Sequence, residues 1–282
     1  MSIKFITDSA SDIAQGSKKD VIVLPMTIGF GEEEYKDGVN LTHEEFYGKL
    51  IESDVLPKTS QIPPYDFECA IKEASADGSE IVIVTMSSKL SGTYQSACMA
   101  ASEYRKGVYV VDSENVTVGE MALIEYGLEL REQGKNASEI ADTLNSVKKN
   151  IRLVALLDTL EYLKKGGRIS KTAAFAGSLL SIKPVIAIEY GEVAMLGKAR
   201  GSRQGNNLLV QQIEQSGGIA FDMPLFLGYT GLSDSLLTKY ISDSRPLWED
   251  HIDELKIFTV GGTIGTHAGP GAIAVAFFAK NK

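Results

Sequence analysis

The stretch GTHAGPGAIAVAFF, near the C-terminus, places His267 among three glycines and just ahead of an apolar run. We predict a close-packed turn here, because glycine lets another group approach the backbone. At neutral pH an imidazole can donate one hydrogen bond, for example to a carboxylate oxygen. A lone histidine beside apolar residues is more often structural, so His267 alone identifies no site. The pattern suits a site that is polar at one point and apolar beyond it.

A second polar stretch, MSSKLSGTYQSA, follows a predicted strand and opens a predicted helix. We expect Ser91 to cap this helix, so that the amides of Gly92, Thr93 and Tyr94 point outward. Free amides and the helix dipole attract a carboxylate or a phosphate to such an end. An ordinary helix cap without a ligand is the alternative, and the local pattern favours it slightly.

A third stretch, PKTSQIPPYDF, carries Thr59 and Ser60 ahead of a Pro-Pro pair. The prolines fix the loop and favour the start of a helix directly after it. The two hydroxyls are therefore hydrogen-bond donors in a stiff loop. Taken alone, this motif is more simply interpreted as a capping loop.

Positive charge concentrates between residues 164 and 203, which hold eight basic and two acidic side chains. That segment carries +6, so the rest of the chain carries −15 of the total −9. Its basic residues include Arg168, Arg200 and Arg203. A charge run is usually a solvated face. Because this asymmetry is large and overlaps predicted turns, we favour a docking or anion-facing surface.

The elements that must position these residues alternate in the first half of the chain. Short Val- and Ile-rich runs predict strands at 3–6, 21–26, 80–86 and 108–111. Longer segments between them predict helices at 42–52, 64–76, 91–105 and 117–133. This alternation predicts an α/β domain whose parallel sheet has helices on both faces.

The second half predicts an α+β domain, with the boundary near residue 150 and hence domains of 1–150 and 151–282. Strands are expected at 152–157, at 224–230, at 255–260 and over 184–196, the last a hairpin turning at Tyr190-Gly191. Helices are expected near 170–182, 203–216 and 233–243.

Small hydroxyl or acidic residues follow three of the predicted strands. Asp8, Ser11, Ser91 and Asp112 lie just past the apolar runs. The carboxyl ends of parallel strands converge on one crevice, so these side chains are candidates for a shared site. Turn formation and helix capping are the alternative at each position.

Composition and missing motifs restrict the function. A net charge of −9 argues against a general nucleic-acid binder. The sequence has no P-loop, no dinucleotide fingerprint after the first strand, no nucleophile elbow and no zinc motif. We therefore expect no metal and no cofactor, and a protein that holds a ligand rather than an autonomous enzyme.

The remaining reactive residues are expected to be structural. Cys69 and Cys98 fit no metal or redox spacing and are predicted to be small buried residues. His43 and His251 lie in acidic helical contexts and are predicted at the surface. No run approaches the roughly 18 apolar residues of a membrane span, and MSIKFITDS indicates a strand rather than a signal peptide. We expect a cytoplasmic protein.

Eight stretches, in this order, resemble the DegV family of bacterial lipid-binding proteins. They lie between residues 3 and 275 and are ITDSASDI, KTSQIPPYDF, SSKLSGTYQSA, VVDS, LEYLKKGGRIS, SIKPVIAIEYGEV, KARGSR and GTIGTHAGPG. The resemblance implies an N-terminal α/β domain, a C-terminal α+β domain and one long-chain, palmitate-like fatty acid with its tail in an apolar tunnel. Some members are the non-catalytic subunit of a fatty acid kinase. They present the carboxylate to a separate ATP-binding subunit, and the acyl phosphate feeds phospholipid synthesis.

The resemblance also implies site residues, carried over by motif. The fatty-acid carboxylate would be held by Thr59, Ser91, Gly92 and His267. Further candidates for the same neighbourhood are Ser60, Thr93 and Arg168. Docking to the kinase subunit or to a membrane surface would fall to Arg200 and Arg203.

Two other functions stay open at this point. One is a standalone phosphotransferase or hydrolase that uses His267 on a small polar metabolite. The implied fold resembles dihydroxyacetone kinase, in which a histidine can hold a carbonyl substrate covalently. The missing nucleotide motif and the lack of an activated nucleophile count against it. The other is a protein in which the lipid is a passive passenger.

Overall fold

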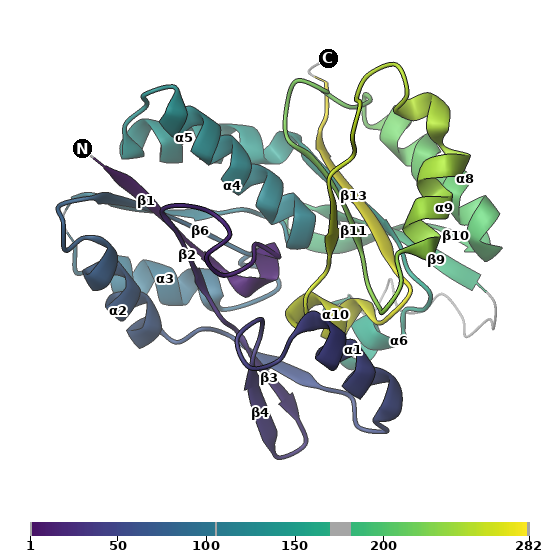
Figure 1. Cartoon of the computed structure of the whole chain (residues 1–282), viewed down its shortest axis with the longest axis horizontal. Helices are drawn as coiled ribbons and strands as arrows, with labels where there is room; N and C mark the ends of the chain where they lie inside the picture. Colours follow the sequence, from purple (N-terminus) through teal and green to yellow (C-terminus); the bar gives the residue numbers. More distant parts are fainter. Residues whose placement is uncertain (1, 105, 170–181, 281–282) are drawn as a thin grey trace.

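A four-stranded parallel sheet forms the first half of the fold (Figure 1). The structure is a computed structural model that describes residues 2–104, 106–169 and 182–280. The strands run in the order β2-β1-β6-β7, with bounds β2 (Val21–Leu24), β1 (Ile3–Asp8), β6 (Glu80–Thr85) and β7 (Val108–Asp112). One face is covered by α2 (Pro64–Ala74) and α3 (Thr93–Ala101), the other by α4 (Thr117–Glu132) and α5 (Ala137–Val147). The predicted parallel α/β arrangement is confirmed.

The second large sheet is mixed and has six strands in the order β10-β9-β8-β13-β11-β12. Their bounds are β10 (Glu192–Arg200), β9 (Ile182–Glu189), β8 (Ile151–Leu156), β13 (Ile273–Phe278), β11 (Leu225–Tyr229) and β12 (Ile257–Thr259). Helices α8 (Gly201–Gln215) and α9 (Ser235–Asp243) pack on one face. Helix α4 packs on the other face as well as on the first sheet, so its first eight residues, Thr117 to Ile124, are all buried.

A third, small sheet was not anticipated from the sequence. It is antiparallel, in the order β4-β3-β5, with β4 (Glu33–Lys36), β3 (Thr27–Phe30) and β5 (Lys58–Ser60). Its strands have only three or four residues, too few for an alternating pattern to stand out. Helix α1 (His43–Glu52), which begins at a Thr42–Glu45 capping box, packs beside it through Phe30 and Phe46.

The glycine-rich stretch around His267 is a helix, α10 (Gly262–Ala268), and not the predicted turn. Its glycines serve close packing. A Cβ at Gly265 would lie 2.6 Å from Tyr47 Oη and 2.7 Å from Phe46 Cε1. A Cβ at Gly262 would lie 2.6 Å from Ile28 Cδ1. The helix therefore lies directly on α1 and β3. Positive φ angles occur only after it, at Gly269 of its C-terminal cap (71°) and at Gly271 in the turn that follows (78°).

Most other predicted elements are confirmed, with ends shifted by a few residues. The hairpin turns at Tyr190-Gly191, where both residues have positive φ as a tight two-residue loop requires. The helix expected near 170–182 lies outside the described residues. The second sheet begins at Ile151, while the division into domains near residue 150 stays a prediction. Within the described ranges, no helix combines the length and apolarity that crossing a membrane requires.

Two expectations about reactive residues were wrong. Cys69 is exposed and Cys98 is partly exposed, because both face outward from α2 and α3 rather than toward the sheet. His43 is half-buried, since α1 packs against the segment that leads into α10, and burial lowers the pKa of its imidazole. His251 is exposed, as predicted, and its ring stacks on Phe221.

The packing of α10 on α1 predicts a stability difference between two glycine variants. Gly265→Ala should lower the free energy of unfolding by about 1–3 kcal/mol, because its Cβ overlaps two buried aromatic rings. Gly48→Ala, in the middle of α1, meets no atom within 4 Å and should raise it by about 0.5–1 kcal/mol. Urea unfolding of both variants measures the difference. Equal effects would contradict the packing described here.

Candidate functional site

A cavity of about 400 Å³ lies between the two large sheets. It is bordered by the start of α4, by α10 and by the short helix α6 (Glu161–Lys165), whose Leu163 lines it. This volume falls in the range of roughly 300–1,000 Å³ that holds small-molecule ligands in proteins. The lining is mostly apolar, with polar side chains gathered at one end.

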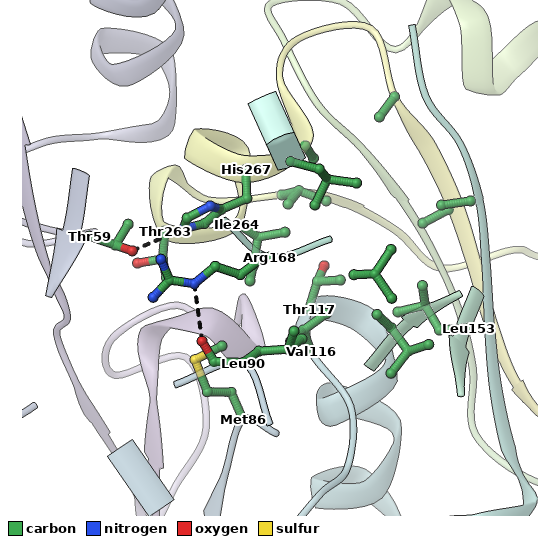
Figure 2. A pocket seen from close by; sticks show the side chains of 18 of the residues that line it. Thr59, Met86, Leu90, Val116, Thr117, Leu153, Arg168, Thr263, Ile264 and His267 are labelled. Atoms are coloured by element: carbon green, nitrogen blue, oxygen red, sulfur yellow. Dashed lines mark hydrogen bonds between the residues drawn. The ribbon is translucent and has the colours of Figure 1, made fainter. Parts of the chain in front are cut away.

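The polar end is built around a hydrogen bond of 3.0 Å between Thr59 Oγ1 and His267 Nε2 (Figure 2). Thr59 is the middle residue of β5, and pairing with Ile28 on β3 fixes its direction. His267 lies in the last turn of α10. Its ring packs against Gly166, where a Cβ would lie 2.2 Å from Nδ1. Glycine at 166 is therefore needed to make room for the imidazole.

The His267 imidazole is neutral at physiological pH. Burial and, second, the nearby Arg168 guanidinium lower its pKa to about 4. Nδ1 is buried and has no partner among the described residues. When the proton is on Nε2, the imidazole donates to Thr59 Oγ1, and the Thr59 hydroxyl is then free to donate to a ligand.

Ser91 and Gly92 form the second wall of the polar end. Gly92, not Ser91, occupies the cap position of α3, although Ser91 Oγ accepts a hydrogen bond of 3.3 Å from the Thr93 amide. The Ser91 and Thr93 hydroxyls lie 2.9 Å apart. A Cβ at Gly92 would lie 1.9 Å from Gln61 Oε1, so glycine lets Gln61 lie across the start of α3.

Arg168 supplies the positive charge at this end of the cavity. Its Nε donates to Leu90 O at 3.2 Å and its Nη1 to Gly166 O at 2.7 Å. Both acceptors are backbone carbonyls, and no carboxylate of the described chain forms an ion pair with Arg168. The charge is therefore available to an anionic ligand held beside the neutral His267.

The opposite end is apolar. It is lined by side chains from four strands of the mixed sheet, β8, β9, β10 and β13. Among them are Leu153, Ala155, Ile186, Ile188, Val193 and Ala274. Figure 2 shows Leu153 far from the Thr59–His267 pair, with Val116 and Thr117 between them. The apolar run that follows His267 is β13, and Ala272, Ile273 and Ala274 do line the cavity, as the sequence suggested. The arrangement fits an elongated ligand with one polar, anionic end.

The structure brings most of the predicted site residues together. Those that line the cavity are Thr59, Ser60, Ser91, Gly92, Arg168 and His267. Thr93 is buried behind Ser91 and does not line it. Arg200 and Arg203 are exposed, at the end of β10 and in the first turn of α8. Polar lining residues that were not named as site candidates are Gln61, Thr117 and Thr263. Gln61 and Thr263 lie in stretches that carry the family resemblance, whereas Thr117 lies in none of them.

Of the four strand-end candidates, only Ser91 lines the cavity, and the other three have a supporting role. Asp8, Ser11 and Asp112 do not line the cavity. Asp8 accepts hydrogen bonds from the amides of Met86 (2.9 Å) and Ala10 (3.0 Å), and Asp112 accepts one from the Ser88 amide (3.1 Å). The loop that carries Ser91 is therefore held by carboxylates from β1 and β7.

Four buried carboxyl groups lie behind the polar end, namely Asp8, Asp12, Asp37 and Glu120. Burial raises the pKa of Asp8 to about 7, that of Asp12 to about 8, and that of Glu120 well above its usual value. Among the residues that the structure describes, no group of His, Cys, Asp and Glu is arranged to hold a metal ion. These carboxyls accept hydrogen bonds from the protein itself.

Comparison with known proteins gives a consistent match. A sequence model of the DegV family, described as uncharacterised proteins, matches residues 2–280. A DegV domain-containing protein of Caldanaerobacter subterraneus is 30% identical over 283 residues, with 99% of each chain covered. A DegV family protein from Thermus thermophilus, described by its fatty acid binding, superposes with a TM-score of 0.88 at 28% identity, covering 99% of this chain and 100% of that one. A stearic acid-binding protein from Eubacterium ventriosum gives 0.88 at 26% identity, covering 99% and 98%.

The environment of His267 predicts its titration. We expect its imidazole to gain a proton only near pH 4, because burial and Arg168 oppose the charged form. Unfolded chains bind this proton near pH 6.5, so His267 should lower stability as pH falls from 6.5 toward 4. Long-range ¹H–¹⁵N NMR of the imidazole measures the pKa. Arg168→Gln should raise it while burial keeps it below 6.5, and a wild-type midpoint near 6.5 would rule out this account.

Proposed function

Because the chain belongs to the DegV family, and because its cavity joins a polar, cationic end to an apolar interior, we propose that it binds one long-chain fatty acid. The observation that carries the proposal is the cavity itself. Hydroxyls, a neutral imidazole and one guanidinium lie at one end, and most of the other lining side chains are Leu, Ile, Val, Ala and Met. The described fatty acid binding of the Thermus thermophilus and Eubacterium ventriosum proteins supports it.

Most of the affinity would come from the tail. A saturated C16 chain gains roughly 10 kcal/mol gross at about 0.8 kcal/mol per buried CH₂, before the costs of association and ordering. The polar end then fixes the orientation of the ligand more than its affinity.

The carboxylate would lie between the two walls of the polar end. Thr59 and Ser91 offer hydroxyls, Gly92 offers its amide, and His267 holds Thr59 in place or donates directly. Arg168 would balance the negative charge, and Ser60 offers a further hydroxyl on the cavity lining. This set of donors matches a monoanion, because one cation and several neutral donors face the same point.

We further propose that the protein presents this carboxylate to a separate ATP-binding kinase subunit, which forms the acyl phosphate. The exposed Arg200 and Arg203 belong to the basic segment 164–203 and lie outside the cavity. Like-signed exposed charges favour docking to an acidic partner surface or an anionic membrane.

Mass spectrometry tests the binding proposal. Native spectra of the purified protein should show one added mass that is lost on denaturation, and lipid extraction should identify it as a long-chain fatty acid. A protein that stays empty when delipidated and offered palmitate, or that retains a small polar metabolite instead, would overturn the proposal.

A larger side chain in the apolar part of the cavity should weaken ligand binding. Ala274→Leu adds a bulky side chain to the apolar lining, and we expect roughly tenfold weaker fatty acid binding, equal to about 1.4 kcal/mol. Ala194→Leu is the matched control, since Ala194 pairs with Ala187 and does not line the cavity. Displacement of a fluorescent fatty acid measures both variants. Equal losses in the two would indicate a general packing effect.

The polar end should matter more for phosphorylation than for binding. Thr59→Val, Ser91→Ala and His267→Ala leave the tail contacts in place, so we expect modest loss of affinity but a large loss of acyl phosphate formation with a fatty acid kinase subunit. Acyl phosphate formation at the wild-type rate in all three variants, with tail affinity equal to wild type, would refute the assigned carboxylate site.

A further inference from the structure

We propose that Asp37 is a positioning residue that holds α10 in the place where His267 meets Thr59. The Thr59–His267 hydrogen bond belongs to the polar end of the cavity, so the effect of Asp37 on ligand binding rests on the proposed function. The geometry itself does not depend on any ligand. Asp37 does not line the cavity, and its side chain is almost fully buried at 3% exposure.

The Asp37 carboxylate accepts four hydrogen bonds. Two come from the first amides of α10, with Gly262 N 3.1 Å from Oδ1 and Thr263 N 3.1 Å from Oδ2. The Thr263 hydroxyl also donates to Oδ2, and Ser9 Oγ donates to it from 3.1 Å. Both oxygens are thus used, and three of the four donors belong to α10 itself.

The start of α10 needs such an acceptor. The first amides of a helix have no partner within the helix, and a capping side chain usually supplies one. Here the cap position is Gly261, which has no side chain. Asp37 takes over this role from a distant part of the chain, and Asp12 completes it by accepting from the Gly261 amide at 2.7 Å. A carboxylate at this end also interacts favourably with the positive end of the helix dipole.

The position of Asp37 links the two partners of the Thr59–His267 hydrogen bond. It follows β4 directly, and its amide donates to Met26 O at 3.0 Å, just before β3. Strand β3 pairs with both β4 and β5, and β5 carries Thr59. Asp37 therefore ties the small sheet that directs Thr59 to the helix that carries His267.

No Lys or Arg of the described chain pairs with Asp37. The titratable groups that face it are His43 on α1, whose pKa burial lowers, the buried Asp8 and Asp12, and Tyr47, whose hydroxyl donates to Val260 O at 2.9 Å. The carboxylate is held by hydrogen bonds from α10 and Ser9 rather than by an ion pair. An amide in its place would turn an NH₂ toward amide donors, which leaves buried donors unpaired.

The test compares Asp37→Asn with Asp8→Asn in the ligand-free protein. Asp8 is an equally buried carboxyl that accepts two backbone amides but makes no bond to α10, so it is the matched control. In Asp37→Asn we expect the His267 ¹⁵N resonances to shift and its pKa to rise from about 4 toward 6.5, as the ring loses its buried place beside Thr59. In Asp8→Asn both should stay at their wild-type values.

Two outcomes would overturn the positioning role. One is a folded Asp37→Asn protein with wild-type His267 resonances, and the other is an equal change in Asp8→Asn. Should Asp37→Asn fail to fold, Thr263→Val keeps the carboxylate and removes one of its donors from α10, and it should move the same resonances by less. A lack of fatty acid in a protein whose His267 responds as expected would reject the proposed function and leave the positioning role standing.

Discussion

Helix α10 is only seven residues long, and contacts with several other segments fix its position. Two of its glycines lie where a side chain would overlap Ile28, Phe46 and Tyr47. The amides at its start donate hydrogen bonds to carboxylates from distant segments, and the ring of His267 packs against Gly166. A helix this short is not stable alone, so its position is set by these tertiary contacts. The polar end of the cavity depends on that position, because Thr59 and His267 are separated by 208 residues in the chain.

In the parallel sheet, too, some polar residues position the site without lining the cavity. Carboxyl ends of parallel strands usually meet at a ligand crevice. Here the carboxylates of Asp8 and Asp112 instead accept amides of the loop that leads to Ser91. The acids thus stay behind the cavity wall, and hydroxyls and one guanidinium face the ligand space. This placement keeps acidic side chains out of the lining of a cavity suited to an anion.

The sequence predicted the large elements well because their cause is local. The apolar run 80–86 predicts a strand and Tyr190-Gly191 predicts a hairpin turn from the local residues alone, and the structure has both. Thr59, Ser91 and His267 came from motifs and do lie around one cavity. Helix α10 was mistaken for a turn, because glycine in a sequence signals conformational freedom and says nothing of a neighbouring ring. Asp37 was missed for a related reason: three of its four donors belong to α10, more than two hundred residues away in the chain.

The electrostatics of the site favour binding over autonomous chemistry at His267. A general base works best when its pKa lies near the working pH, and burial lowers that of His267 to about 4. Its Nε2 already bonds to Thr59, and no carboxylate of the described chain accepts from Nδ1 to raise its basicity. An imidazole of this kind orients a hydroxyl and stays uncharged beside Arg168. An uncharged ring keeps the polar end at a single positive charge, which is what one carboxylate needs.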